Sequence, residues 1–404
     1  MRMANPDSKP RPLAGVRVLD LTNVVMGPMA TRIMGDLGAE VVKVEPVEGD
    51  FMRDFVPQRS EGMSGFTLNL NRNKRSIVLD LKSAAGRQAI LDLAATSDVF
   101  VTNMRTAAIE RLGISYDDIR EVAPAIVYVS ANGFGSDGPY AAKPAYDDVI
   151  QAASGLASMF AWLGDEPAYM PSIIADKVTG LHIAYATMAA LYRKAITGEG
   201  DYVEVPMAET LAAFNLVEHL NGHTFEPSQD PFSYQRLMTK HRRPRRTADG
   251  WICVLPYTNK NYRDFFLLME RPDLADDPRF NGVNVRIDNV DALYGILDEM
   301  IQTKSTAEWL ELCDEHSIPS APVVDLEHIG DDPHFDAVGL LEVQQHPSEG
   351  AYKVVKDPVM FQSSQSVVRR HAPRLGQHTE EVLAELGYTS EQIAAARPEK
   401  LDGQ

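Results

Sequence analysis

The residue whose type and position best suit a chemical role is Asp176, a carboxylate just before a long apolar run, Val178 to Tyr192. The run is rich in strong helix formers and predicts a helix. An aspartate before a helix is typical of an N-cap, where its side chain accepts hydrogen bonds from free backbone N–H groups. The helix dipole would also hold the carboxylate ionised and aimed, and such a carboxylate can attack an activated acyl group. The residues around Asp176 are compatible with either role.

Composition limits the partners of the chain. Its 404 residues carry a formal net charge of -18, which argues against nucleic acid or an anionic membrane as the main partner. A local basic pocket would still suit a small anionic ligand. The two cysteines, Cys253 and Cys313, cannot build a disulfide framework or a CxxC metal site. The ten histidines show no HExxH spacing, so no metal is expected.

Targeting signals are missing from the pattern of the chain. Residues 1–12 are polar and proline-rich, without the apolar core of a signal peptide. The longest uncharged apolar stretch, 178–192, falls short of the ~20 residues that span a bilayer. Together with the low cysteine count, this predicts a cytoplasmic location.

The first part of the chain alternates between short apolar strands and helices, which predicts an α/β fold with a doubly wound parallel sheet. Strands are expected at 15–21, 41–44, 77–79, 99–101, 126–129 and 202–205. Helices are expected from Pro28 to residue 37 and at 84–95, 107–112, 116–122, 147–158 and 209–220. The segment 45–73 reads as irregular, which is typical of a lid or another functional loop.

The loop after the first strand reads Asn23 to Pro28 and lacks the glycine-rich dinucleotide fingerprint. A nicotinamide or flavin cofactor is therefore not expected. Ligands in such sheets still bind at the carboxyl ends of the strands. The loops after Leu21, Val44, Val101 and Val129 are the candidate walls of the site.

The composition of the chain changes after Asn221. A linker-like cluster at 226–233 precedes an expected hairpin at 247–254 and helices at 262–270, 290–303 and 306–316. A terminal helix is expected at 379–386. We predict a large α/β domain in 1–225, a smaller α+β domain in 226–325, and a return segment, 326–404, that completes the large domain.

Stretches spread over nearly the whole chain resemble the family III CoA-transferases, the group of formyl-CoA transferase and the carnitine and bile-acid CoA-transferases. The resemblance is carried by residues 13–20, 34–45, 71–76, 198–200 with 203–205, and 372–376. It implies an interlocked homodimer that uses a coenzyme A thioester as substrate and needs no other cofactor. It also places the family's nucleophilic aspartate on Asp176, which would attack the donor thioester and carry CoA as an aspartyl thioester.

The resemblance further implies a CoA groove in the large domain. Its residues would be Val24, Leu79, Lys82, Asn103, Met104, Arg111 and Lys143. Lys82 and Arg111 are suited to CoA phosphates, although isolated surface cations are usually only solvated. The match around Lys143 is displaced by one residue, and Val24 and Leu79 are equally suited to a core.

Tyr146 stands where related racemases place a histidine. Without that histidine one of two opposed bases is missing, which disfavours racemisation. Tyr146 would then cover the reacting thioester or simply pack.

The basic run Lys240 to Arg246 reads either as a solvated loop or as a receiver of the acceptor's carboxylates. The glycine-rich lid of formyl-CoA transferase has no counterpart here, which argues against oxalate as acceptor.

The sequence thus predicts a CoA-transferase that moves CoA from a short acyl-CoA to a carboxylic acid through Asp176. Two alternatives stay open. One is an acyl-CoA racemase or intramolecular CoA mover of the same family, and the other is a non-catalytic CoA-binding protein.

Overall fold

The computed structural model describes residues 11–164, 166–362, 364 and 368–397, which form two compact units. The first unit takes its described residues from Met1–Ser154, Met170–Leu211 and His334–Gln404. The second takes them from Gly155–Tyr169 and Ala212–Pro333. No helix in the described ranges is both long and apolar enough to cross a membrane.

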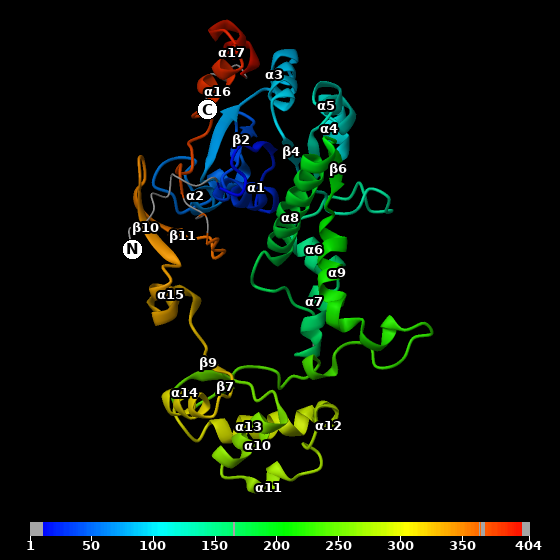
Figure 1. Ribbon diagram of the computed structural model, residues 1–404, viewed down its shortest axis with the longest axis vertical. Coiled ribbons are helices and arrows are strands. Elements are labelled where there is room, and N and C mark those ends of the chain that lie inside the picture. Colours follow the sequence, from blue (N-terminus) through cyan, green and yellow to red (C-terminus); the bar gives the residue numbers. More distant parts are fainter. Residues whose placement is uncertain (1–10, 165, 363, 365–367, 398–404) are drawn as a thin grey trace. The chain divides into compact units, whose positions relative to one another are not determined.

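A parallel six-stranded sheet forms the centre of the first unit (Figure 1), in the order β3-β2-β1-β4-β5-β6. Its strands are β1 (Arg17–Leu21), β2 (Glu40–Glu45), β3 (Lys74–Val78), β4 (Val99–Thr102), β5 (Val127–Ser130) and β6 (Asp201–Glu204). The strand order reverses between β1 and β4, where ligands bind in sheets of this type. The doubly wound α/β fold predicted from the sequence is confirmed.

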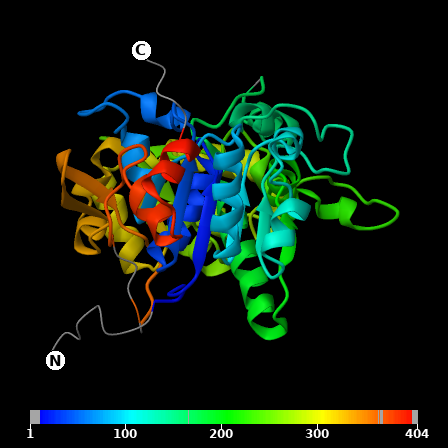
Figure 2. The ribbon, with the colours of Figure 1, turned by 90° about the horizontal axis from the view of Figure 1, so that it is seen from above.

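Helices cover the two faces of this sheet. On one face, Leu19, Val42, Ile77 and Phe100 belong to an apolar core with α3 (Ala84–Ala95), α4 (Thr106–Leu112) and α5 (Tyr116–Val122). The C-terminal helices α16 (Thr379–Glu385) and α17 (Ser390–Ala396) join the same core and lie beside β3 and α3 (Figures 1 and 2). On the other face lie α1 (Met26–Asp36) and α8 (Ile174–Thr197), which pack against each other.

The sheet face toward α1 carries charges where an apolar strand surface would be expected. Asp20 pairs in register with Lys43, and Lys43 with Ser76, so alternation along the strands places all three on one face. Asp20 and Lys43 are fully buried. Lys74 forms an ion pair of 3.1 Å with Asp20, whose second oxygen accepts a hydrogen bond from the Thr22 hydroxyl. Burial opposes ionisation of Asp20, but Lys74 and Lys43 outweigh it and lower its pKa to about 2.

The stretch Asn71 to Ser76 fastens the C-terminal segment to the sheet. The Asn73 side-chain oxygen accepts from the backbone N–H groups of Arg369, at 2.7 Å, and Arg370, at 3.1 Å. The Ser76 carbonyl accepts from the His378 N–H at 2.9 Å. A stretch that carries much of the sequence resemblance therefore has a structural role in closing the first unit.

Three local expectations are wrong. The helix expected at 147–158 is two helices, α6 (Asp147–Ala153) and α7 (Leu156–Met159), because Gly155 between them has a left-handed φ of 86°. Pro28 is the third residue of α1 and not the first. The segment 45–73 is not irregular throughout, since it contains the 3₁₀ helix η2 (Phe51–Asp54) and α2 (Gly65–Leu70).

The remaining elements of the first unit lie at its chain connections. A hairpin of β10 (Leu341–His346) and β11 (Gly350–Val355) precedes the C-terminal helices, and the Val355 carbonyl accepts from Arg72 at 2.8 Å. Helix α9 (Met207–His219) begins in this unit and continues into the second, and α15 (Pro333–Ala337) stands at the return.

The second unit is a small α+β structure with its own apolar core around Trp309, Phe265 and Leu297. Its antiparallel sheet has the order β7-β8-β9. Besides α7 and most of α9, it contains η3 (Phe160–Trp162), η4 (Asn221–Thr224), η5 (Gln235–Leu237), β7 (Arg245–Arg246), β8 (Trp251–Val254), α10 (Asn259–Leu268), α11 (Pro272–Ala275), α12 (Val283–Asp288), α13 (Val290–Ile301), α14 (Thr306–Glu315), β9 (Ser320–Pro322) and η6 (Leu326–Asp331). The expected hairpin is present as β7 and β8; it begins two residues earlier than predicted and ends at Val254 as predicted.

Candidate active site

A cleft of about 570 Å³ opens at the carboxyl ends of the strands in the first unit. Its walls come from the loops after β1, β2, β3 and β4, where the sheet topology predicts a ligand. The lining includes Thr22, Asn23, residues 45–51, residues 79–82, Met104 and Leu112.

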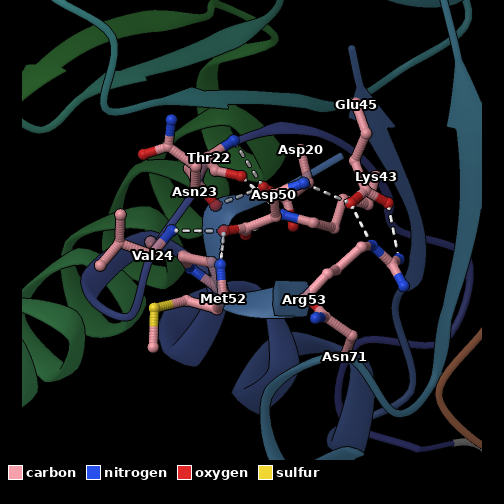
Figure 3. A network of polar contacts seen from close by, with 12 residues as sticks. Asp20, Thr22, Asn23, Val24, Lys43, Glu45, Asp50, Met52, Arg53 and Asn71 are labelled. Atoms are coloured by element: carbon pink, nitrogen blue, oxygen red, sulfur yellow. Dashed lines mark hydrogen bonds and ion pairs between the residues drawn. The ribbon is translucent and has the colours of Figure 1, made fainter. Parts of the chain in front are cut away.

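Asp50 joins two walls of this cleft (Figure 3). One of its oxygens accepts from the backbone N–H groups of Val24 and Met52, each at 3.1 Å. Its other oxygen pairs with Lys43 at 3.0 Å, and the Lys43 ammonium also donates to the Thr22 carbonyl at 2.6 Å. Val24 is held at a φ of 66°, a conformation that is uncommon for a β-branched residue. The loops after β1 and β2 are thus fixed to each other by a buried charge pair.

Glu45 and Arg53 hold the base of the second wall (Figure 3). Arg53 donates to both Glu45 oxygens, at 2.7 and 2.8 Å, and both side chains are buried. Burial opposes ionisation of Glu45, but Arg53 and Lys43 outweigh it and lower its pKa to about 2. Arg53 also donates to the Pro373 carbonyl at 3.2 Å. The cleft is therefore supported from the C-terminal segment as well.

Three of the predicted groove residues line the cleft: Leu79, Lys82 and Met104. Leu79 is also part of the apolar core and almost fully buried, whereas Lys82 is exposed. Asn103 lies at the strand-order reversal, where its side chain exchanges two hydrogen bonds with the backbone of Asn23, at 3.0 and 2.9 Å. It therefore fixes the loop after β1 against the loop after β4.

The other predicted residues lie outside the lining of the cleft. Arg111 is exposed on the last turn of α4, beside the lining residue Leu112. Lys143 is exposed and places its ammonium 3.6 Å from the centre of the Tyr140 ring. Tyr146 is 69% exposed and immediately precedes α6.

Asp176 is the third residue of α8, which begins at Ile174. The expectation that its side chain caps the helix is wrong, because a turn at 170–174 starts the helix earlier than the apolar run suggests. The backbone N–H of Asp176 donates instead to the Asp147 carboxylate at 3.1 Å. Asp147 thus supplies the cap from another helix. Within the described residues, no hydrogen bond to the carboxylate of Asp176 is found.

Asp147 is itself fixed by Gln151, one turn later in α6. The Gln151 amide donates to Asp147 at 2.6 Å and to the Ser172 carbonyl at 3.1 Å, and its oxygen accepts from the Met170 N–H at 2.9 Å. Gln151 is fully buried. It holds the chain entering α8 against α6, and so fixes the position of Asp176.

The environment of Asp176 disfavours its ionised form. Burial, followed by the nearby negative charge of Asp147, raises its pKa to about 7. Burial and Asp147 thus oppose the effect that the sequence predicts for the helix dipole, which would hold this carboxylate ionised. A carboxyl group with this pKa can take up and release a proton near neutral pH, as an acid–base group requires, and its ionised fraction can act as a nucleophile.

Gly180 brings the Asp176 helix against the start of α1. A Cβ at Gly180 would lie 2.8 Å from the Met26 carbonyl oxygen, so only glycine permits this approach. Asp176 precedes Gly180 by one turn on the same helix face. Asp176 therefore lies near the face of α8 that packs against α1, and α1 begins after the β1 loop that forms a wall of the cleft.

Sequence reasoning missed Asp50 and Gln151 as parts of this site. Asp50 follows a glycine in a segment without periodicity. Gln151 carries only a weak signal, its i,i+4 spacing from Asp147 on a predicted helix.

Known proteins resemble this chain over nearly its whole length. The sequence pattern of CoA-transferase family III matches residues 13–379. Human succinyl-CoA:glutarate CoA-transferase is 32% identical over 382 residues, which cover 93% of this chain and 86% of that protein. Formyl-CoA:oxalate CoA-transferase of Streptomyces coelicolor is 32% identical over 400 residues, covering 94% and 97%. The crystal structure of a CAIB/BAIF family protein from Brucella suis superposes with a TM-score of 0.80 at 26% identity, covering 94% and 100%.

The fold, the cleft and these matches define an enzyme that acts on acyl-CoA thioesters. The chain belongs to CoA-transferase family III.

Proposed function

We propose that this enzyme moves CoA from an acyl-CoA donor to a carboxylic acid through a covalent aspartyl-CoA on Asp176. The observation that carries the proposal is the half-buried carboxyl group of Asp176, with its pKa raised to about 7 by burial and by Asp147. Asp147 caps the helix, so the Asp176 oxygens stay available for attack.

The proposed transfer passes through a mixed anhydride and a thioester of Asp176. An oxygen of ionised Asp176 attacks the donor thioester carbonyl, the C–S bond breaks, and a mixed anhydride and CoA thiolate result. The thiolate then attacks the aspartyl carbonyl of the anhydride, which releases the donor acid and leaves aspartyl-CoA. The acceptor carboxylate reverses this sequence and leaves with CoA. Dividing the exchange into such steps is the general advantage of covalent catalysis, and near-equal thioester energies remove any need for ATP.

The cleft at the strand ends is the proposed CoA groove, with Lys82 at its wall and Arg111 beside it as phosphate contacts. The acceptors named for two relatives are glutarate and oxalate, which makes carboxylic diacids the first acceptors to test here. Glutarate comes before oxalate, because this chain lacks the glycine-rich lid of formyl-CoA transferase. A homodimer is also proposed, since Leu181, Tyr185, Tyr192 and Ile196 are each more than half exposed along one face of α8.

The test is to incubate the enzyme with acyl-CoA and no acceptor, digest it, and measure the masses of its peptides by mass spectrometry. CoA is expected on the peptide that contains Asp176. Hydroxylamine should release it and inactivate the enzyme. Asp176→Asn is nearly isosteric and should show no adduct and a loss of transfer by several orders of magnitude. Normal transfer by the Asn variant, or an adduct on another residue, would refute the assignment.

A second measurement separates the role of Asp176 from general damage. The folded pKa of about 7 lies above the ~3.9 of an unfolded aspartate. The folded state therefore binds the proton more tightly, and stability is lost as pH rises from about 4 through 7. The Asn variant lacks this loss, so its melting temperature relative to wild type should increase between pH 5 and pH 8.

A further inference from the structure

The second unit contains a cavity of about 290 Å³ with an unusual excess of positive charge. Four arginines line it, Arg236, Arg242, Arg243 and Arg245, and Tyr262 and Tyr294 form an aromatic wall. We call it the arginine pocket. In a chain with a net charge of -18, such a cluster needs an explanation.

The carboxylates around the arginine pocket do not balance its cations. Within the described residues, the ion pairs of its arginines lead only to Asp298, which is shared by Arg243 and by the buried Arg245. Arg236 and Arg242 form no ion pair in the same residues. The pocket therefore holds a surplus of about three positive charges at neutral pH.

Two of the four guanidinium groups, those of Arg236 and Arg245, are held in place by contacts with Tyr294, whereas Arg242 and Arg243 are exposed. Arg236 donates through Nε to the Tyr294 hydroxyl at 3.0 Å. Among the described residues, the terminal nitrogens of Arg236 have no further hydrogen-bond acceptor. Arg245 donates to the Tyr294 carbonyl at 3.0 Å and stacks 4.9 Å from the centre of that ring. Preorganised guanidinium forks of this kind suit the paired oxygens of a carboxylate or a phosphate.

A second cavity, of about 210 Å³, shares Arg236, Tyr262 and Tyr294 with the arginine pocket and adds Arg286. Arg286 is buried, stacks 4.3 Å from the centre of the Tyr262 ring and, among the described residues, pairs with no carboxylate. The positive surplus thus continues beyond the first cavity. Both volumes lie at or below the small end of ligand sites, which fits a small acid or a terminal phosphate and not a whole nucleotide.

We propose that the arginine pocket binds an oxyanion of an organic ligand, a phosphate or a carboxylate group, through Arg236 and Arg242. The two sources are the 3′-phosphate of CoA and the free carboxylate of a diacid. The choice of these two ligands rests on the proposed function, whereas the anion site itself does not. Of the two readings of the basic run, this selects binding over simple solvation.

The chain offers a matched control for this proposal. Arg246 follows Arg245 in β7 and is exposed, so alternation turns it away from the pocket. Arg246→Gln removes one positive charge next to the pocket without touching the cavity lining. The test variant is Arg236→Gln with Arg242→Gln, which keeps the buried Arg245–Asp298 pair.

Calorimetric titration of the full chain with CoA, dephospho-CoA, glutarate and propionate distinguishes the sources. If the pocket binds the 3′-phosphate, the double variant binds CoA about tenfold or more weakly, and dephospho-CoA as wild type does. If it binds a diacid, only glutarate is weakened. Arg246→Gln should match wild type throughout. Equal affinities of all three proteins for every ligand would overturn the proposal.

Two controls keep the result interpretable. Arg242→Gln alone changes an exposed side chain and serves if the double variant is unstable. CoA attachment to Asp176 is measured in parallel. If CoA attaches to Asp176 but the double variant binds every anion as wild type does, the arginine pocket is refuted and the proposed function stands. If anion binding is weakened but no CoA attaches to Asp176, the proposed function alone is refuted.

Discussion

At the scale of single residues, two carboxylates in the first turns of α6 and α8, Asp147 and Asp176, have different roles. Asp147 accepts hydrogen bonds from Asp176 and Gln151, so its oxygens are occupied. Asp176 keeps its oxygens available and gains a raised pKa. The sequence singled out Asp176 and left open whether it caps the helix or reacts. In the structure the cap comes from Asp147, and a cap supplied from another helix leaves no local signal in the sequence.

Asp147→Asn tests this division directly. Removing the Asp147 charge takes away the second cause of the raised pKa of Asp176, while burial remains. The acid limb of the kcat/KM profile should therefore shift to lower pH, by up to about one unit. The Asn oxygen can still accept the Asp176 N–H, so transfer should persist. A profile that stays in place would separate the charge of Asp147 from the titration of Asp176.

Lys82 tests the cleft. Lys82→Ala and Arg111→Ala should each raise KM for acyl-CoA, with a smaller change in kcat, because phosphate contacts far from the thioester give uniform binding. A loss of about 1 kcal/mol is expected for these exposed side chains. Lys356, in the same unit but outside the cleft lining, provides the control. Unchanged KM in both variants would return Lys82 and Arg111 to the solvated surface.

At the scale of elements, the close approach of α8 to α1 at Gly180 sets the position of Asp176. Gly180→Ala would place a Cβ 2.8 Å from the Met26 carbonyl oxygen, and neither helix backbone can yield cheaply. We expect a destabilisation of about 1–3 kcal/mol and a fall in kcat larger than the change in KM.

Gly295→Ala is the matched control for that variant. Gly295 is also helical, in α13, and an added Cβ there meets no atom within 4 Å. The substitution should stabilise the helix by about 0.5–1 kcal/mol. Denaturant unfolding of both variants measures the contrast. Equal effects would mean that packing at Gly180 is not the constraint.

Most elements of the first unit could be predicted because strand length, helix periodicity and terminal glycines are local signals. The helix Ala84–Ala95, for example, matches its expected bounds. The buried charges of β1, β2 and β3 could not be predicted, because their partners are distant in sequence. Lys43, Asp50 and Asp20 become compatible with a core only when the strands pair. The interplay of Asp147 and Asp176 was hidden for the same reason.

At the scale of the whole molecule, the exposed face of α8 remains to be explained. Four large apolar side chains at 181, 185, 192 and 196 recur at helical spacing, which is typical of an interface. A homodimer is expected in sedimentation at low micromolar concentration, and Leu181→Glu with Tyr185→Glu should weaken it. A wild-type monomer under these conditions would refute the interlocked arrangement.

The fastening of Asn73 to Arg369 and Arg370 has a consequence for synthesis on the ribosome. These residues are separated by 296 and 297 positions, which take about 15–60 s to translate at ~5–20 residues per second. During this interval the first strands already exist, but the groups that complete β3 do not. The nascent first unit therefore cannot complete its fold until the last segment is synthesised. Until then the edge of the sheet at β3 is exposed and accessible to chaperones. We expect ribosome-bound chains that end near residue 360 to be cleaved by protease within the first unit, where the released full chain resists.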